Sequence, residues 1–193
     1  GHRFQEFDPY TFYLPYATSL RMSDIGYMNK NQAALNVSYD SLEGYVDSLT
    51  RAIETPYPEY EAIGVRVDGE YRQLNANVLQ IENEYYSFIR PKRTTGSGEK
   101  PTVALRRRGV EYVEVRAIDV SPFDPMGVNL EQLRFIEAFL VYCLLSDSPD
   151  IDAAERDSIS YNELSVALRG REPGLRLRER DRWRDLEDWV GDI

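Results

Sequence analysis

Short helix and strand patterns alternate along this chain, and this alternation limits the folds it can adopt more than any other feature. From Asp40 onward, apolar residues recur with the period of an amphipathic helix, and Pro56 ends the pattern. Residues 63–74 contain two strand patterns around the turn dipeptide Asp68-Gly69, which predicts a β-hairpin. Residues 110–120 form a further strand pattern. The chain is therefore predicted to mix helices with short strands.

Other segments extend this pattern to both ends of the chain. In order, they predict an irregular strand over 11–23 that begins after Pro15, a long strand over 74–89, a helix through Arg108, a helix from Asn129 to Leu145, two helices that open at Asp152 and Ser160, and a tail helix beyond Leu175. The helix that ends at Leu145 is apolar nearly all round at its C-terminal end. We therefore expect it to be central to the core, with Cys143 as part of the packing.

The composition indicates a folded, acidic protein. The 193 residues are 42% hydrophobic and 12% aromatic, which excludes disorder for most of the chain. Lys and Arg number 23 against 33 Asp and Glu, so the net charge is −10. This charge repels phosphate backbones and anionic lipid, so neither nucleic acid nor a membrane surface is expected as a partner.

The cysteine and histidine content excludes two further kinds of site. Cys143 and His2 each occur alone, so the chain has neither an internal disulfide nor the ligand spacing of a zinc site. We therefore expect a reducing, cytoplasmic location. No apolar run is long enough to span a membrane. The chain begins Gly1-His2-Arg3 without an initiator Met or a signal peptide, and we expect it to be a piece of a longer protein.

The strand pattern at 110–120 carries a carboxylate and a guanidinium two residues apart. Alternation places Glu114 and Arg116 on the same face, about 6–7 Å apart along the strand. Glu114 is then a candidate metal ligand, and Arg116 is a candidate clamp for a substrate carboxylate. The ordinary alternative is a structural ion pair on a half-exposed sheet face.

Two neighbouring groups of charges bear on this choice. On the predicted strand over 74–89, Glu82 and Glu84 share a face with Tyr86, and converging carboxylates favour a divalent cation. A solvated acidic face is the alternative. Three basic residues, Arg90, Lys92 and Arg93, precede a glycine-bearing loop and are candidates to bind phosphate, although basic residues at a strand end are usually only solvated.

Four long motifs, in order along the chain, closely resemble the bacterial type of glutamate–cysteine ligase, also known as γ-glutamylcysteine synthetase. They are Tyr16-Ala-Thr-Ser-Leu-Arg-Met-Ser-Asp-Ile-Gly-Tyr27, Asn77-Val-Leu-Gln-Ile-Glu-Asn-Glu-Tyr-Tyr86, Ile89-Arg-Pro-Lys-Arg93 and Glu111-Tyr-Val-Glu-Val-Arg116. The resemblance extends over about residues 13–175, and the tail at 176–193 matches weakly. It implies that residues 1–193 are a single fragment of a larger catalytic domain.

The resemblance also implies a fold and a reaction. The expected fold is α+β and related to glutamine synthetase, with a mainly antiparallel sheet packed with helices. The expected reaction uses ATP and Mg²⁺, or Mn²⁺ in its place, to phosphorylate the γ-carboxylate of glutamate, and the cysteine amine then attacks the acyl phosphate. This forms γ-glutamylcysteine in the first step of glutathione biosynthesis. By the same resemblance, Glu114 is a magnesium ligand, Arg116 is the catalytic clamp for the glutamyl group, and Arg21, Tyr27 and Tyr86 are the wall of the cysteine site.

The chain departs from the family in length. Most of the metal-binding carboxylates and part of the nucleotide site of the family precede this segment, so we expect the fragment to be inactive by itself. Apolar surface left exposed where the missing N-terminal half would dock is expected to favour self-association. Two alternatives remain open: another carboxylate–amine ligase of the glutamine-synthetase-like group, and a non-catalytic binding module.

Overall fold

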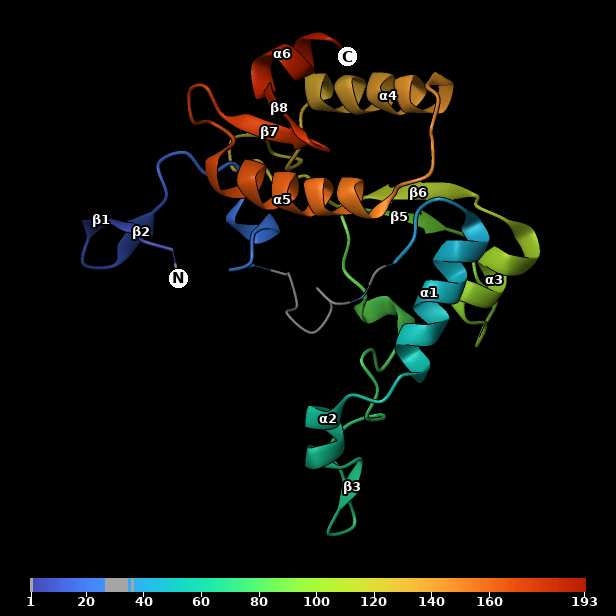
Figure 1. The fold of residues 1–193 in the computed structure, drawn as a ribbon. Coiled ribbons are helices and arrows are strands. Elements are labelled where there is room, and N and C mark those ends of the chain that lie inside the picture. Colours follow the sequence, from blue (N-terminus) through green and yellow to red (C-terminus); the bar gives the residue numbers. More distant parts are fainter. Residues whose placement is uncertain (1, 27–34, 36) are drawn as a thin grey trace. The chain divides into compact units, whose positions relative to one another are not determined.

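A computed structural model describes residues 2–26, 35 and 37–193 (Figure 1). Helices occur together with two-stranded antiparallel sheets, so the predicted α+β class is confirmed. The chain divides into two compact units, one of residues 28–117 and one of residues 1–27 with 118–193. That residues 1–193 are a single fragment of a larger catalytic domain stays a prediction. The two units are described separately.

The core of the unit 28–117 forms around helix α1 (Leu42–Glu54), which packs on α3 (Pro101–Arg108). The Ser41 hydroxyl caps α1 by accepting a hydrogen bond from the Gly44 amide at 3.0 Å. The buried side chains of the cluster follow the helical period on α1 and are completed from two other segments: Tyr45, Val46, Leu49, Ala52, Leu79 and Leu105. The helix predicted between Asp40 and Pro56 is confirmed.

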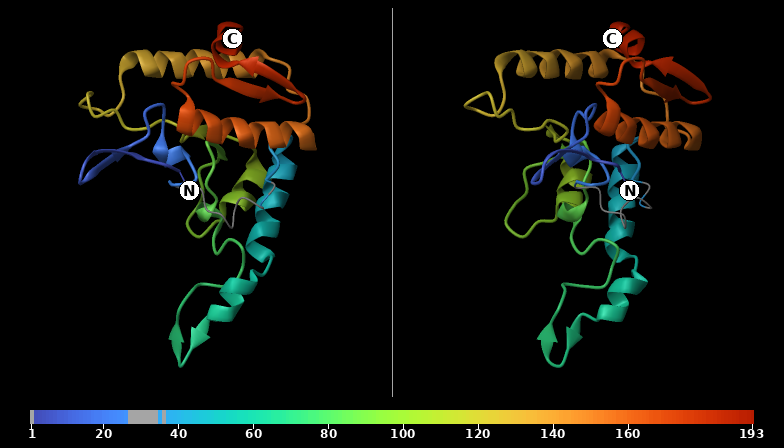
Figure 2. Two further views of the ribbon diagram at one scale, coloured as in Figure 1. Left: turned by 60° about the vertical axis from the view of Figure 1, so that its left-hand side comes forward. Right: turned by 90° about the vertical axis from the view of Figure 1, so that its left-hand side faces the viewer.

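Beyond α1, the chain forms α2 (Pro58–Ile63) and a hairpin of β3 (Arg66–Val67) and β4 (Glu70–Tyr71). Asp68 and Gly69 both have positive φ angles, of 52° and 88°, as the predicted two-residue turn requires. Figure 2 shows these elements continuing past the C-terminal end of α1 within this unit. The predicted hairpin is confirmed.

The long strand predicted over 74–89 is wrong. This segment is irregular, apart from an isolated antiparallel bridge between Asn77 and Pro56, the 3₁₀ turn η2 (Glu82–Glu84) and a short strand, β5, that begins at Ile89. Amide side chains bind the backbone at two points where a strand would need it: Gln80 accepts from the Leu74 amide at 2.8 Å, and Asn75 donates to the Gln80 carbonyl at 2.8 Å. Between these points, the backbone of residues 76–79 bonds to residues 52–57. The alternating faces inferred for Glu82, Glu84 and Tyr86 therefore do not exist.

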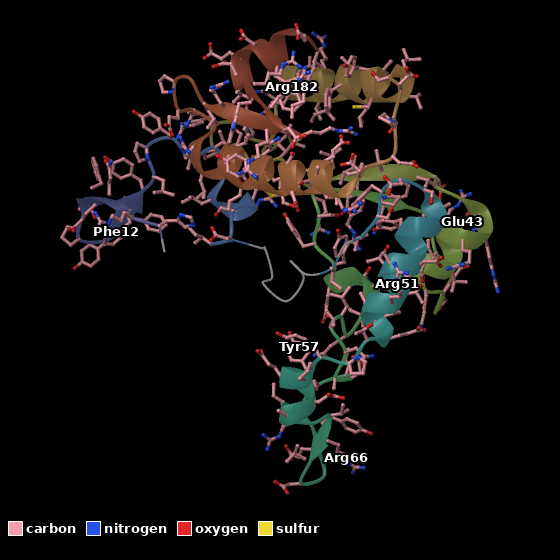
Figure 3. The ribbon with its side chains drawn as sticks, viewed as in Figure 1. Phe12, Glu43, Arg51, Tyr57, Arg66 and Arg182 are labelled. Atoms are coloured by element: carbon pink, nitrogen blue, oxygen red, sulfur yellow. The ribbon has the colours of Figure 1, made fainter. Side chains whose placement is uncertain are left out.

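The unit of residues 1–27 and 118–193 begins with a hairpin of β1 (Gln5–Asp8) and β2 (Thr11–Tyr13). Its side chains include the exposed Phe12 labelled in Figure 3. The strand expected after Pro15 is wrong, because this stretch forms the 3₁₀ turn η1 (Leu20–Met22). The amides of Thr18 and Ser19 donate to the Ala167 carbonyl, at 2.9 and 3.1 Å, and not to a neighbouring strand.

Helix α5 (Ala153–Arg169) is continuous where two helices were predicted. Ser160 lies inside it, because a serine in a helix interior costs only about 0.5 kcal/mol and does not force a new start. Its N-cap, Asp152, was predicted correctly. The segment beyond Leu175 forms the hairpin of β7 (Arg176–Glu179) and β8 (Arg182–Asp185), followed by α6 (Leu186–Gly191), so the predicted tail helix begins too early.

The tail hairpin lies against α5, as Figures 1 and 2 show. Asn162 on α5 pairs with the backbone of Arg178, accepting from its amide and donating to its carbonyl at 2.8 Å each. Trp183 packs edge-on against Tyr161, with ring centroids 5.5 Å apart. These contacts fix the tail hairpin to α5, and Trp183 is still 46% exposed.

Helix α4 (Leu130–Leu145) begins at the predicted place, with a capping box between Asn129 and Gln132, but it lacks the predicted burial. None of its residues is buried within the described part of the chain, and Leu144 and Leu145 are 82% and 81% exposed. Cys143 is exposed as well, so its expected role in packing is wrong. Among the helices described, none combines the length and apolarity that a membrane crossing needs.

Candidate active-site wall on the β5–β6 pair

The candidate site is built on β5 (Ile89–Lys92) and β6 (Tyr112–Val115), which pair antiparallel in the unit 28–117. Arg90 lies opposite Glu114, and Lys92 lies opposite Tyr112. Directly opposed residues share a face of an antiparallel pair, so Arg90, Lys92 and Glu114 project to the same side. Strand β6 is shorter than the strand predicted over 110–120, but it contains Glu114 and places Arg116 just past its end.

Glu114 lies between two cations. Its Oε2 atom is 3.8 Å from Lys92 Nζ and 3.8 Å from Arg116 Nη1. At these distances the groups attract electrostatically without forming hydrogen bonds. The same oxygen is buried and has no hydrogen-bond partner in the described part of the chain. The structure therefore places Glu114 and Arg116 on the same side, and it also shows the ion pairing on a half-exposed sheet face that was the ordinary alternative.

Arg116 is also placed against Tyr86. Its guanidinium carbon lies 4.7 Å from the centre of the Tyr86 ring, and its backbone amide donates to the Phe88 carbonyl at 2.8 Å. The cation–π contact holds the guanidinium near the ring, and the backbone bond continues the β5–β6 pairing by one residue. The structure thus brings together Tyr86, Glu114 and Arg116.

A cavity of about 340 Å³ opens beside this pair of strands. Its walls come from α1, η2, β5, the loop before α3, α3 and β6, and the lining residues are Tyr45, Leu49, Glu82, Asn83, Arg90, Pro91, Lys92, Arg93, Thr94, Thr95, Pro101, Thr102, Leu105 and Tyr112. All three basic residues singled out from the sequence therefore line one cavity. They are not simply solvated at the end of a strand.

The described lining carries three basic residues and one acidic residue, and two of the basic ones also have an acidic neighbour: Glu114 lies 3.8 Å from Lys92, and Glu111 lies 3.6 Å from Arg93. Arg90 is only 6% exposed, and the buried Nε atoms of Arg90 and Arg93 have no hydrogen-bond partner among the residues described. Burial and the neighbouring Tyr39 raise the pKa of Tyr45 to about 12, against the opposing effect of a hydrogen bond with Arg90. The Tyr45 phenol therefore stays neutral beside Arg90 and adds no negative charge. A buried guanidinium such as that of Arg90 favours an anionic ligand.

Glu82 is the one acidic residue in the described lining, and its carboxylate is already bound within the protein. It accepts hydrogen bonds from the Thr102 amide at 2.8 Å and from the Thr102 hydroxyl at 2.6 Å. The first of these bonds gives a partner to a backbone amide in the first turn of α3, where a helix has unpaired N–H groups and a negative charge is favourable. Glu84 likewise accepts from the Gln80 amide at 2.7 Å. The prediction that Glu82 and Glu84 converge on a cation is therefore wrong.

The described residues contain no cluster of three or more His, Cys, Asp or Glu side chains that would hold a metal ion. Glu114 remains the candidate ligand, and it offers one carboxylate. Mg²⁺ prefers octahedral oxygen coordination and commonly takes one or two carboxylates together with substrate phosphates. The donor set therefore fits a contribution to a magnesium shell rather than a complete site.

Arg21 lies on η1, in the unit of residues 1–27 and 118–193. Its Nε donates to Asp119 Oδ1 at 2.6 Å, and its Nη2 donates to the Ile118 carbonyl at 3.0 Å. Tyr27, the other residue predicted for this part of the site, lies outside the described residues. Sequence reasoning also missed Tyr45, Thr102 and Asp119. Each is distant in sequence from the group it contacts, so no local pattern marks it.

Comparison with known proteins gives one consistent result. The sequence profile of a family described as glutamate–cysteine ligase matches residues 1–166. A solved structure of glutamate–cysteine ligase from Francisella tularensis in complex with AMP superimposes with a TM-score of 0.91 and 40% sequence identity. That likeness covers 98% of this chain and 38% of the solved one.

Curated relatives agree with the profile. A glutamate–cysteine ligase from Pseudomonas paraeruginosa is 54% identical over 98% of this chain, and one from Shewanella oneidensis is 58% identical over 97% of it. In both cases the match covers 36% of the relative. The chain therefore spans little more than a third of the length of the curated relatives it matches.

Proposed function

The chain belongs to the glutamate–cysteine ligase family, and from this premise we propose that it forms one wall of the active site of an ATP-dependent ligase. In the proposed reaction, the γ-carboxylate of glutamate is phosphorylated by ATP. The amine of cysteine then attacks the γ-glutamyl phosphate, forming an amide bond and releasing phosphate. The observation that carries the proposal is the side-by-side placement of Glu114 and Arg116, 3.8 Å apart, next to a cavity lined by three basic residues.

Arg116 is the proposed clamp for the glutamyl substrate. A guanidinium held beside the Tyr86 ring suits bidentate binding of a carboxylate. Glu114 is the proposed magnesium ligand, and its buried Oε2 has the lone pairs that this role requires. When bound, Mg²⁺, or Mn²⁺ in its place, would neutralise charge that develops on the transferred phosphoryl group. Tyr86 and Arg116 form a continuous surface for the amino-acid substrates.

Arg90, Lys92 and Arg93 are the proposed contacts to the phosphates of ATP. Phosphoryl transfer is catalysed mainly by positioning and by charge stabilisation, and both need cations aimed at the phosphate oxygens. The buried Arg90, with an Nε that no described group satisfies, meets this need better than an exposed side chain would. The AMP in the Francisella structure is consistent with a nucleotide site in the family.

On the cysteine side, we propose that Arg21, Tyr27 and Tyr86 form the wall of the substrate site. Their basic and phenolic groups match a carboxylate and a small polar side chain. The remaining two thirds of the relatives' length is the proposed source of the other metal ligands and the rest of the nucleotide site. We therefore propose that residues 1–193 alone do not turn over substrate, and that the ligase acts in the cytoplasm.

The test is a ligation assay on the full-length ligase that contains this chain, with glutamate, ATP, Mg²⁺ and a panel of acceptor amines. The proposal predicts equal amounts of ADP and γ-glutamylcysteine, with cysteine strongly preferred. Arg90→Met should raise the KM for ATP by about tenfold or more, because a charged hydrogen bond is worth roughly 1.5–3 kcal/mol. Arg51→Met is the matched control, since Arg51 lies exposed on α1, as labelled in Figure 3.

Two outcomes would contradict this assignment. Preference for an acceptor other than cysteine would favour another carboxylate–amine ligase of the glutamine-synthetase-like group. If Arg90→Met had the same KM for ATP as the Arg51→Met control, the cavity would not be part of the nucleotide site.

A further inference from the structure

The one-turn helix η1, which carries Arg21, is held by the C-terminal end of α5. The last carbonyls of a helix lack partners within the helix. Here the Ala167 carbonyl accepts from the amides of Thr18 and Ser19, and the Val166 carbonyl, which also accepts from the Gly170 amide at 2.8 Å, accepts from the Thr18 hydroxyl at 2.5 Å. A single 3₁₀ turn has little stability of its own, so these bonds determine where its backbone lies. They do not determine where the long side chain of Arg21 points.

That direction is set by the segment that follows β6. Asp119 Oδ1 accepts from Arg21 Nε at 2.6 Å, and the Ile118 carbonyl accepts from Nη2 at 3.0 Å. Two acceptors on one edge of a guanidinium fix both its position and its plane. This contact joins residues 98 positions apart in the sequence.

Asp119 is itself held in its charged form. Partial burial would raise its pKa, but hydrogen bonds from the Ser19 side chain and from Arg21 outweigh this effect, and the pKa of Asp119 lies below its usual value. Ser19 is also the N-cap of η1, where its hydroxyl oxygen accepts from the Met22 amide at 3.2 Å. The carboxylate therefore contacts both the start of the turn and the side chain that the turn presents.

We propose that Asp119 is a positioning residue that orients Arg21 toward the carboxylate of the acceptor amino acid. This inference rests on the proposed role of Arg21 in the cysteine site. Asp119 acts through Arg21 and does not itself touch substrate. Because Asp119 follows Arg116 by three residues, one short stretch of chain carries the proposed metal ligand, the proposed glutamate clamp and the anchor of Arg21.

The test measures steady-state kinetics of the full-length ligase with Asp119→Asn, which keeps the size of the side chain and removes its charge. The inference predicts an increase of about tenfold in the KM for cysteine, with kcat and the KM values for glutamate and ATP changed by less than about threefold. Asp119→Glu should recover part of the loss. Asp47→Asn is the matched control, because Asp47 pairs with Arg106 on a half-exposed surface of the other unit.

Arg21→Met, alone and combined with Asp119→Asn, separates the inference from the function on which it rests. If Asp119 acts through Arg21, the double variant has the KM for cysteine of Arg21→Met alone. An Arg21→Met enzyme with an unchanged KM for cysteine would reject the proposed role of Arg21. A raised KM in Arg21→Met but not in Asp119→Asn would reject the positioning role of Asp119. If Asp119→Asn raised the KM values for cysteine, glutamate and ATP equally and also lowered the thermal stability, Asp119 would be only structural.

Discussion

At the scale of single residues, Glu163 on α5 couples stability to pH. Burial raises the pKa of its carboxyl group to about 7. The folded state therefore binds the proton more tightly than the unfolded state, in which an ordinary glutamate titrates near 4.3. The contribution of the protonated Glu163 to the free energy of unfolding is therefore fully present below about pH 4.3. It is lost as the pH rises through about 7.

Glu163→Gln should remove this loss, because the amide has a similar shape and no charge to bury. We expect the variant to be more stable than the wild-type chain at pH 8 by about 1–2 kcal/mol, and to differ little from it at pH 4.5. Urea unfolding at both pH values measures the difference. A gain of equal size at both would mean that burial of the charge is not its cause.

The residue scale also shows where sequence patterns fail. Glu114 and Arg116 were placed on one side by alternation alone, because a strand fixes the direction of side chains two residues apart. The same rule failed for Glu82, since the amide side chains of Asn75 and Gln80 bind the backbone that a strand would have needed. The contact of Arg21 with Asp119 joins two distant segments, and no local pattern predicts it.

At the scale of elements, α1 and α4 show why local order can be predicted when burial cannot. Both have an apolar period and a capped start, and both were predicted as helices. The apolar face of α1 is covered by residues of this chain, including Leu79 and Leu105. None of the α4 side chains is buried among the residues described, because burial depends on surface that another part of a protein must supply.

The exposed end of α4 predicts self-association of the isolated chain. Leu144 and Leu145 are adjacent and nearly fully exposed, and Phe135 is 66% exposed. Leu144→Lys with Leu145→Lys should lower the mass measured by light scattering at high concentration toward that of a monomer. The free energy of unfolding should change by less than about 0.5 kcal/mol, since neither side chain is buried. A wild-type chain that is strictly monomeric at high concentration would contradict this prediction.

At the scale of the whole molecule, the described residues gather basic side chains around one cavity but form no group of three or more side chains that could hold a metal ion. Arg90, Lys92 and Arg93 converge on one cavity, and Glu114 offers one carboxylate beside Arg116. Phosphoryl transfer between two anions needs more charge compensation than one metal ligand can organise. The proposed activity therefore belongs to a longer ligase, in line with the 36% of the curated relatives that this chain covers.

The central claim is that β6 offers a carboxylate to Mg²⁺ and a guanidinium to glutamate from the same side. The most direct measurement compares Glu114→Gln and Arg116→Lys in the full-length ligase. We predict that Glu114→Gln raises the Mg²⁺ concentration for half-maximal activity by about tenfold or more and changes the KM for glutamate by less than about threefold. Arg116→Lys should raise the KM for glutamate by about tenfold or more and change the Mg²⁺ requirement by less than about threefold. If the two variants changed the same constant equally, or neither constant, the claim would be contradicted.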